Sequence, residues 1–269
     1  MRLLAIFWFA CAAFAQSTPR YDEVYYPSGN LRIAAYLYRP AGKGPFPVVI
    51  YNHGSRAGSE RNSAPFTFAG QLLSDVGYLA LVVERRGYGR SDGMQFSEQV
   101  GADRGAKFVA RLQEETDDVL AAAEYVKTLP YADSGRIAVM GWSLGGMISV
   151  FAASRSPAFR AAINQAGGSL TWDGNPAIQK ALTGAAAKIR IPTLCMVARN
   201  DRTTKAVEAV AQEMKRRGAP SKLIVYPNYD EPKAPRAPAP GHLLFAAPGA
   251  RLWREDVLQF LAETLVIAH

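Results

Sequence analysis

The stretch Arg136-Ile-Ala-Val-Met-Gly-Trp-Ser-Leu-Gly-Gly-Met147 predicts how the chain folds. Ile137–Met140 is a short apolar run typical of a strand, and Gly145–Ala153 is small and apolar, as at the start of a packed helix. Between them, residues 141–145 match the pattern G-x-S-x-G, which favours a sharp strand-to-helix turn that exposes the Ser143 hydroxyl. Glycine on either side of the serine avoids collisions and tolerates unusual backbone angles. The alternative is a glycine-rich turn with an incidental serine.

The composition is that of an ordinary protein with one well-filled core. The chain has 269 residues, of which 49% are hydrophobic and 20% are charged. This length fits a single α/β domain over residues 16–269. The formal net charge is +8, but the basic residues are scattered along the sequence. We therefore expect the positive charge to increase solubility and to attract the protein weakly to anionic surfaces. We expect no nucleic-acid partner.

The N-terminus has the pattern of a cleavable signal peptide. Arg2 supplies a positive charge, residues 3–13 are nearly all apolar, and residues 13–15 form an A-x-A cleavage motif. We expect residues 1–15 to be removed after Ala15 and the protein to be exported, either to a periplasm or outside the cell. An uncleaved anchor or a buried first helix is the alternative. No later apolar run approaches the ~18 residues of a membrane span. Cleavage would leave Cys195 alone, and we expect it to be a buried residue of a strand.

Strands and helices alternate through most of the chain. A turn at residues 27–30 separates two runs rich in Tyr, Val, Ile and Leu, which predicts an antiparallel hairpin. The eight expected strands span residues 21–26, 31–39, 47–51, 78–84, 137–140, 161–165, 192–198 and 222–226. The expected helices span residues 66–76, 114–129, 145–153, 176–188, 204–217 and 252–266. This alternation predicts an α/β fold: a mostly parallel central sheet with an antiparallel N-terminal hairpin and helices on both faces.

An acid and a histidine follow later strands at the edge of the sheet that carries Ser143. Asp201 comes directly after the strand at residues 192–198, and His242 lies in the last loop before the final helix. A histidine can accept the serine proton, and a carboxylate can fix the histidine tautomer. The order serine, acid, histidine is the order of one large class of hydrolases. Other acids considered for the third position are Asp92, Asp173, Asp230 and Glu231.

Only three histidines are available, so the choice of base is narrow. His269 is the last residue, and His53 follows the strand at residues 47–51. We expect His53 to be structural or to line the substrate site, with the role of base as the alternative. An oxyanion would be bound by the backbone N–H groups of Leu144 and Ser55.

The sequence offers few features that could determine which substrate is bound. Trp142 and Trp172 are candidates for lining the substrate site, with ordinary core packing as the alternative. Residues 166–191 are too few for a large helical cap, so we expect a minimal cap. The proline-rich loop at residues 230–240 is a hypothetical wall of the cleft. No cluster of His and Cys indicates a metal, and no cofactor is expected.

Five stretches together resemble the α/β-hydrolase superfamily, most closely its dienelactone-hydrolase and prolyl-oligopeptidase-like branch. They are Asn52-His-Gly-Ser55, Glu84-Arg-Arg-Gly-Tyr-Gly-Arg-Ser91, Gly141-Trp-Ser-Leu-Gly-Gly146, Asn200-Asp201 and Gly241-His242. Two departures matter. Dienelactone hydrolases proper carry a cysteine where this chain has Ser143, and the oligopeptidases carry a propeller domain that 269 residues cannot accommodate.

The resemblance and the residues together favour an exported serine hydrolase that cleaves carboxylic esters through an acyl-enzyme. The alternative is a serine peptidase or amidase that acts on small peptides. A third hypothesis is a non-catalytic binding protein with the same fold. The expected partner is a small ester or a short peptide, with no stable membrane span after cleavage, and the sequence makes no prediction of oligomeric state.

Overall fold

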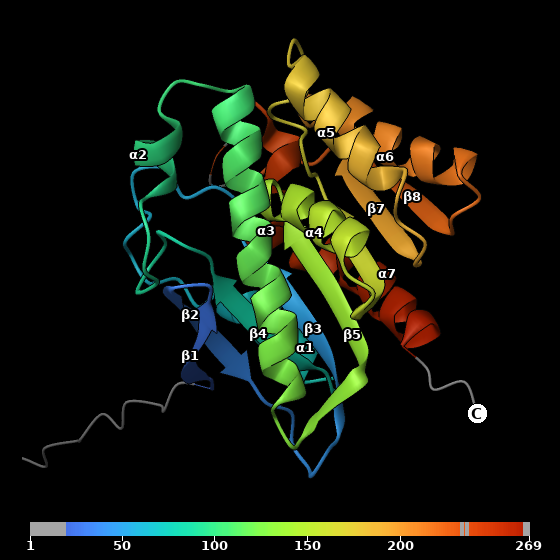
Figure 1. Ribbon diagram of the computed structural model, residues 1–269. Coiled ribbons are helices and arrows are strands. Elements are labelled where there is room, and N and C mark those ends of the chain that lie inside the picture. Colours follow the sequence, from blue (N-terminus) through green and yellow to red (C-terminus); the bar gives the residue numbers. More distant parts are fainter. Residues whose placement is uncertain (1–19, 232–233, 235–236, 266–269) are drawn as a thin grey trace, which may run out of the picture.

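The fold of the chain is organised around one eight-stranded sheet (Figure 1). The structure is a computed structural model, and it describes residues 20–231, 234 and 237–265. The strands are β1 (Asp22–Ser28), β2 (Leu31–Tyr38), β3 (Phe46–Asn52), β4 (Leu79–Glu84), β5 (Ala132–Trp142), β6 (Phe159–Gln165), β7 (Thr193–Ala198) and β8 (Ser221–Tyr226). Their order across the sheet is β1-β2-β4-β3-β5-β6-β7-β8. All eight expected strands are present.

The sheet is mixed in the way that the sequence predicts. β1 pairs with β2 as an antiparallel hairpin, from Asp22 opposite Leu37 to Ser28 opposite Leu31. β2 is also antiparallel to β4, and the pairs from β4 to β8 are all parallel. Parallel strands end at a common edge of the sheet, so the loops after β3, β5 and β7 meet there.

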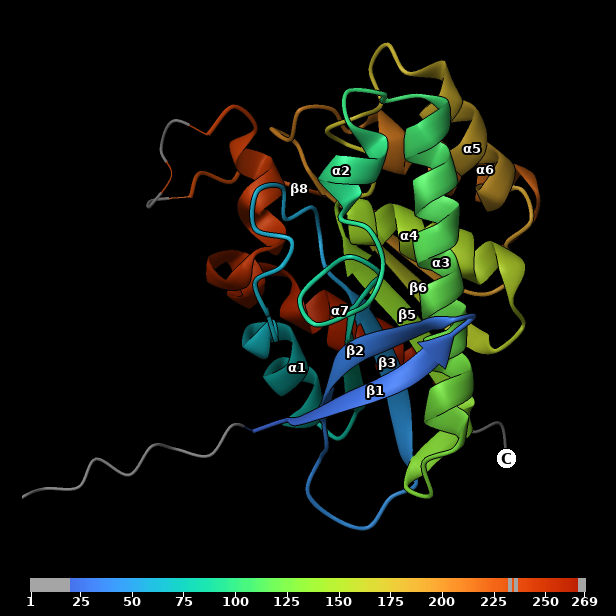
Figure 2. The same ribbon diagram turned by 60° about the vertical axis from the view of Figure 1, so that its left-hand side comes forward.

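Helices cover both faces of the sheet, which explains why all six residues of β4 and of β7 are buried. Figure 2 shows α1 and α7 on one side of the sheet and α3, α4, α5 and α6 on the other. The helices are α1 (Thr67–Ser74), α2 (Phe96–Val100), α3 (Ala106–Lys127), α4 (Leu144–Arg155), α5 (Pro176–Ala186), α6 (Lys205–Arg216) and α7 (Ala250–Thr264). The expected α/β-hydrolase architecture is confirmed.

Two α-helices differ from the prediction, and two short 3-10 helices, Pro240–Phe245 and Ala247–Gly249, were not predicted. The five-residue helix α2 was not expected, and α3 begins at Ala106, two turns before the predicted start at residue 114. The early part of α3 was missed because Arg111, one turn before Glu115, is fully buried although it is charged. Buried charges interrupt the apolar periodicity from which an amphipathic helix is recognised.

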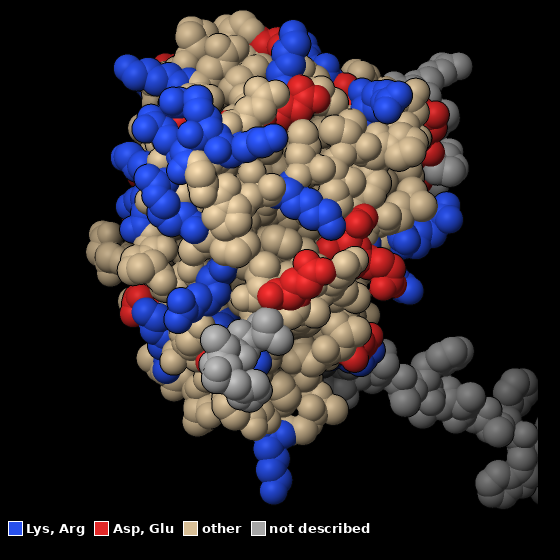
Figure 3. All heavy atoms as spheres, turned by 90° about the vertical axis from the view of Figure 1, so that its right-hand side faces the viewer, with Lys and Arg blue, Asp and Glu red and all other residues tan. Residues whose placement is uncertain are grey.

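The predicted signal peptide lies outside the described residues. Within the described part of the chain, no helix is both long and apolar enough to cross a membrane. The expectation for Cys195 is confirmed, since it is fully buried in β7 and burial raises the pKa of its thiol to about 12. Figure 3 views the molecule from the side of α6 and β8, where Lys and Arg gather on one part of the surface and Asp and Glu on another.

The positions of two leucines in the sheet predict that their substitution by alanine has different effects on the free energy of unfolding. Leu81 is fully buried in β4, whereas Leu223 on the edge strand β8 is 39% exposed. Leu81→Ala should lower the free energy of unfolding by about 2 to 5 kcal/mol, because it removes packed methyl groups and leaves a cavity. Leu223→Ala is the matched control and should change it by about 0.5 kcal/mol or less. Urea unfolding followed by circular dichroism measures both, and equal losses would contradict the assignment of β4 to the core.

Candidate active site

Ser143 lies at the junction between β5 and α4, with a backbone conformation that few residues other than glycine adopt. Its φ is 58° and its ψ is −116°. The Ser143 N–H donates to the carbonyl of Gln165 at the end of β6, at 2.8 Å. The flanking glycines are required by close contacts, since a Cβ on Gly145 would lie 2.0 Å from the Asn52 carbonyl oxygen. A Cβ on Gly141 would lie 2.3 Å from the carbonyl oxygen of Gly145. The G-x-S-x-G pattern therefore has its expected geometry.

Ser143, His242 and Asp201 form a continuous hydrogen-bonded chain. The Ser143 hydroxyl donates to His242 Nε2 at 2.8 Å, and His242 Nδ1–H donates to Asp201 Oδ2 at 2.9 Å. The Asp201 side chain is fully buried and that of His242 is 7% exposed. Asp201 Oδ1 also accepts the backbone N–H of Arg202 at 2.7 Å. This arrangement can remove a proton from the serine and stabilise the resulting imidazolium.

The loops that carry Asp201 and His242 are fastened to each other. The side-chain amide of Asn200 donates to the Tyr229 carbonyl at 3.0 Å and accepts the Tyr229 N–H at 2.9 Å. The N–H of Gly241 donates to the carbonyl of Asn200 at 3.3 Å. The indole N–H of Trp142 donates to the His242 carbonyl at 3.1 Å. The distance between Asp201 and His242 is thus set by contacts among the segments that follow β7 and β8 and the end of β5.

The two N–H groups expected to bind an oxyanion lie close to Ser143. Leu144 is the first residue of α4, where a backbone N–H has no acceptor within its own helix. Ser55 belongs to the turn at residues 53–56, which lies against Ser143: a Cβ on Gly54 would lie 3.3 Å from the Cβ of Ser143. The turn is held by Arg56, whose guanidinium donates to the buried carboxylate of Glu84 at 2.8 Å.

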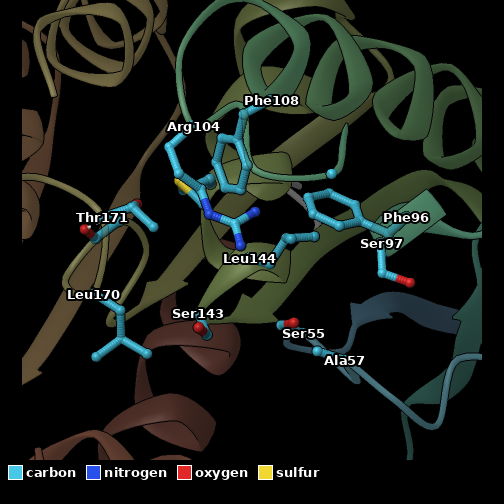
Figure 4. A pocket seen from close by; sticks show the side chains of 13 residues that line it. Ser55, Ala57, Phe96, Ser97, Arg104, Phe108, Ser143, Leu144, Leu170 and Thr171 are labelled. Carbon is cyan, nitrogen blue, oxygen red and sulfur yellow. Dashed lines mark hydrogen bonds between the residues drawn. The ribbon is translucent and has the colours of Figure 1, made fainter. Parts of the chain in front are cut away.

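A cavity of about 250 Å³ opens beside Ser143. Its walls are mainly apolar side chains, and its lining includes Phe96, Phe108, Leu144, Met147 and Leu170. Figure 4 shows the guanidinium of Arg104 directed into the same space. Within the part of the chain that the structure describes, this guanidinium has no ion pair. The cavity therefore suits a group that is apolar over most of its surface and carries negative charge at one point.

His53 does not line this cavity, so of the two roles expected for it, structural or substrate-lining, the structure shows the structural one. Its side chain is fully buried, with the ring stacked on Phe66 at 5.4 Å and edge-on to Tyr88 at 4.6 Å between ring centroids. Its Nδ1–H donates to the Gly54 carbonyl at 2.7 Å. Burial and the nearby Arg85 guanidinium hold the pKa of His53 well below its usual value. A buried, neutral His53 is structural and is not the base.

The two tryptophans also lie elsewhere than in the lining of this cavity. Trp142 supports the His242 loop through its indole N–H. Trp172 is 9% exposed and packs into the apolar layer between the sheet and helices α3 to α6. Core packing, the alternative for Trp172, is the arrangement found, because the indole surface is shared with that layer.

Several residues that form the cavity were missed from the sequence. Phe96, Ser97 and Arg104 belong to α2 and the loop after it, and Phe108 belongs to the first turn of α3. The proline-rich loop, parts of which lie outside the described residues, contributes none of the described lining of this cavity. The signal that could have found them is the pair of phenylalanines in a segment with few other large apolar residues. No metal-binding cluster of three His, Cys, Asp or Glu occurs among residues 20–231, 234 and 237–265.

Comparison with known proteins identifies the family. The model of the dienelactone hydrolase family matches residues 33–232. The quorum-quenching protein AidA of Acinetobacter baumannii is 27% identical over 176 residues, covering 64% of this chain and 53% of AidA. The chain therefore spans about half the length of that relative. Because the family model matches most of the chain, the protein belongs to the dienelactone hydrolase family.

Solved structures confirm the fold. The acylaminoacyl peptidase of Pyrococcus horikoshii has a TM-score of 0.67 at 19% identity, covering 91% of this chain and 41% of that chain. The esterase Pf2001 of Pyrococcus furiosus has a TM-score of 0.64 at 16% identity, covering 91% of each chain. At these identities the likeness concerns the fold, so both a peptidase and an esterase share the architecture described above.

The buried state of His53 predicts a pH dependence of stability. In the folded protein its pKa is lowered, so it stays neutral where the unfolded chain binds a proton, below about pH 6.5. Below this pH the unfolded state binds more protons than the folded state. His53 therefore lowers the free energy of unfolding by up to about 1.4 kcal/mol for each unit by which the pH falls below about 6.5. His53→Asn lacks this contribution, so the stability advantage of wild type over the variant should shrink from about pH 7 to about pH 5. Urea unfolding across this range measures it, and a constant difference would show that His53 titrates normally.

Proposed function

We propose that this member of the dienelactone hydrolase family is a serine hydrolase that cleaves carboxylic esters through an acyl-enzyme. The observation that supports the proposal best is the hydrogen-bonded chain from the Ser143 hydroxyl through His242 to Asp201, at the mouth of an apolar cavity. A serine hydroxyl is a weak nucleophile unless a base accepts its proton. The neighbouring His242 Nε2 is free to accept it because Nδ1 carries the other hydrogen.

The proposed reaction uses these groups in two halves. The Ser143 oxygen attacks the ester carbonyl while His242 Nε2 takes its proton, and Asp201 stabilises the imidazolium. The N–H groups of Leu144 and Ser55 bind the negative oxygen of the tetrahedral intermediate. His242 returns the proton to the leaving alcohol, so that an ester between Ser143 and the acyl group remains. Water, deprotonated by His242, then releases the acid and restores Ser143.

A peptidase or amidase reaction is the second candidate, because the same groups can protonate a leaving amine and one structural neighbour is a peptidase. Comparing turnover of acyl p-nitroanilides with that of the matching p-nitrophenyl esters separates the two. We expect esters to be preferred by more than their greater chemical reactivity accounts for. A preference for anilides would favour the peptidase.

We also propose that the protein is exported, with residues 1–15 removed as a signal peptide. The proposal rests on the sequence pattern of these residues alone, which lie outside the described part of the chain. N-terminal sequencing of protein secreted or recovered from the periplasm of a bacterial host should begin at Gln16. A mature protein that begins at Met1 would contradict it.

Ser143→Ala should lower turnover of p-nitrophenyl acetate by about 10⁴-fold or more, since the triad groups act as a unit. Ser134→Ala is the matched control, because this exposed serine lies at the opposite end of β5. A fluorophosphonate probe should label wild type and Ser134→Ala but leave Ser143→Ala unlabelled. Equal turnover in wild type and Ser143→Ala would refute the proposal, and an unreactive, unlabelled wild type would favour the non-catalytic binding protein.

The cation in the cavity predicts a preference for acyl groups that carry a negative charge. Arg104 is exposed, and an exposed ion pair contributes about 0.2 to 1 kcal/mol, so Arg104→Met should lower kcat/KM for p-nitrophenyl monoglutarate by about 2- to 5-fold. The uncharged p-nitrophenyl valerate, of similar length, should change by less than about 1.5-fold, since methionine keeps the apolar part of the wall. Proportional losses for the two esters would show that Arg104 only shapes the cavity.

A further inference from the structure

One carboxylate, that of Glu115 on α3, lies between two segments that form the candidate active site. Its Oε2 accepts the Arg85 Nε–H at 2.7 Å, and its Oε1 accepts the Arg111 Nε–H at 2.8 Å. The side chains of all three residues have no exposed surface. A single negative charge thus compensates two buried guanidinium groups, one through each oxygen.

The first guanidinium fixes the turn that carries Ser55. Arg85 follows the last residue of β4, and its Nη2 donates to the carbonyl of His53 at 3.0 Å. His53 lies two residues before Ser55, whose N–H is one of the two proposed oxyanion donors. The position of that donor relative to Ser143 therefore depends on where Glu115 holds Arg85.

The second guanidinium fixes the wall of the cavity. Arg111 Nη1 donates to the carbonyl of Met94 at 3.0 Å and to the side-chain oxygen of Gln99. These residues flank Phe96, whose ring centroid lies 5.8 Å from the guanidinium carbon of Arg111. Phe96 lines the cavity. The helix α2 has only five residues, so contacts outside the helix are needed to hold it in place.

We propose that Glu115 is a positioning residue that sets the 53–56 turn and α2 relative to each other, through Arg85 and Arg111 respectively. This inference rests on the proposed esterase function. Removing the charge of a buried, paired carboxylate leaves both guanidinium groups uncompensated in the interior, which is strongly unfavourable. Each guanidinium is then free to seek another partner, and the turn and the wall shift independently.

The Arg85 and Arg111 contacts of Glu115 predict different kinetic effects. Arg85→Lys cannot contact both Glu115 and His53 in the fork geometry of arginine. It should lower kcat for p-nitrophenyl acetate and octanoate alike, by up to about 10²-fold, because a displaced oxyanion donor affects every ester. Arg111→Lys should lower kcat/KM for octanoate at least 5-fold more than for acetate, since only the long acyl chain reaches α2. Glu115→Gln should show both effects together.

Full-length protein is used for all measurements, at a temperature where circular dichroism shows each variant to be folded. Titration with a fluorophosphonate gives the fraction of reactive Ser143, and each kcat is divided by this fraction. Glu124→Gln is the matched control, because this carboxylate is also on α3 but its side chain is 69% exposed. Its kinetics should equal those of wild type.

The inference is overturned if Glu115→Gln keeps wild-type kcat and chain-length preference, or if Arg85→Lys and Arg111→Lys give the same pattern. If Glu115→Gln does not fold, the two arginine variants decide, since a positioning role requires them to differ. Failure of the proposed function is distinguishable, because wild type would then neither hydrolyse esters nor react with the fluorophosphonate.

Discussion

The close approach of β3, β5 and β6 around Ser143 is the constraint on which the candidate site depends. The positive φ of Ser143 is unfavourable for a residue with a side chain and persists only where its surroundings hold it. Here the end of β6 accepts its N–H, and the end of β3 lies against Gly145, so close that no Cβ fits. The same approach brings the turn after β3 beside Ser143. The strain at Ser143 and the position of the proposed oxyanion donor therefore have a common cause.

The parallel register explains how much of this arrangement the sequence could predict. Asp201 follows β7, and Ser143 follows β5, so their strands deliver them to one edge of the sheet. Strand ends of this kind are read from short apolar runs and glycines, which are local features. His242 lies in a longer segment, and its contact with Asp201 depends on Asn200 and Tyr229, which no local pattern connects. His242 was selected as the candidate base because the chain has only three histidines.

The start of α3 and the wall of the cavity could not be predicted from the sequence for one physical reason. Arg111 and Glu115 occupy interior positions of α3 that periodicity reserves for apolar residues, and their mutual pairing is visible only in three dimensions. The wall of the cavity depends on this pairing, so it was missed as well. The sequence left His53 as either structural or substrate-lining because the end of a strand has both a solvent side and a core side. Which side the ring takes is decided by Phe66 and Tyr88, from other parts of the chain.

The buried charges behind the 53–56 turn also give the region a definite electrostatic sign. Arg85 and Arg111 carry two positive charges against the single negative charge of Glu115, so one positive charge is left uncompensated within this cluster. Its effect is visible at His53, where the Arg85 charge contributes to the lowered pKa. The same positive charge favours an anion beside the turn, which lies against Ser143 at Gly54. Charge interactions persist over longer distances in a protein interior than in water. The cluster that makes α3 hard to recognise from sequence thus also has the polarity that an oxyanion requires.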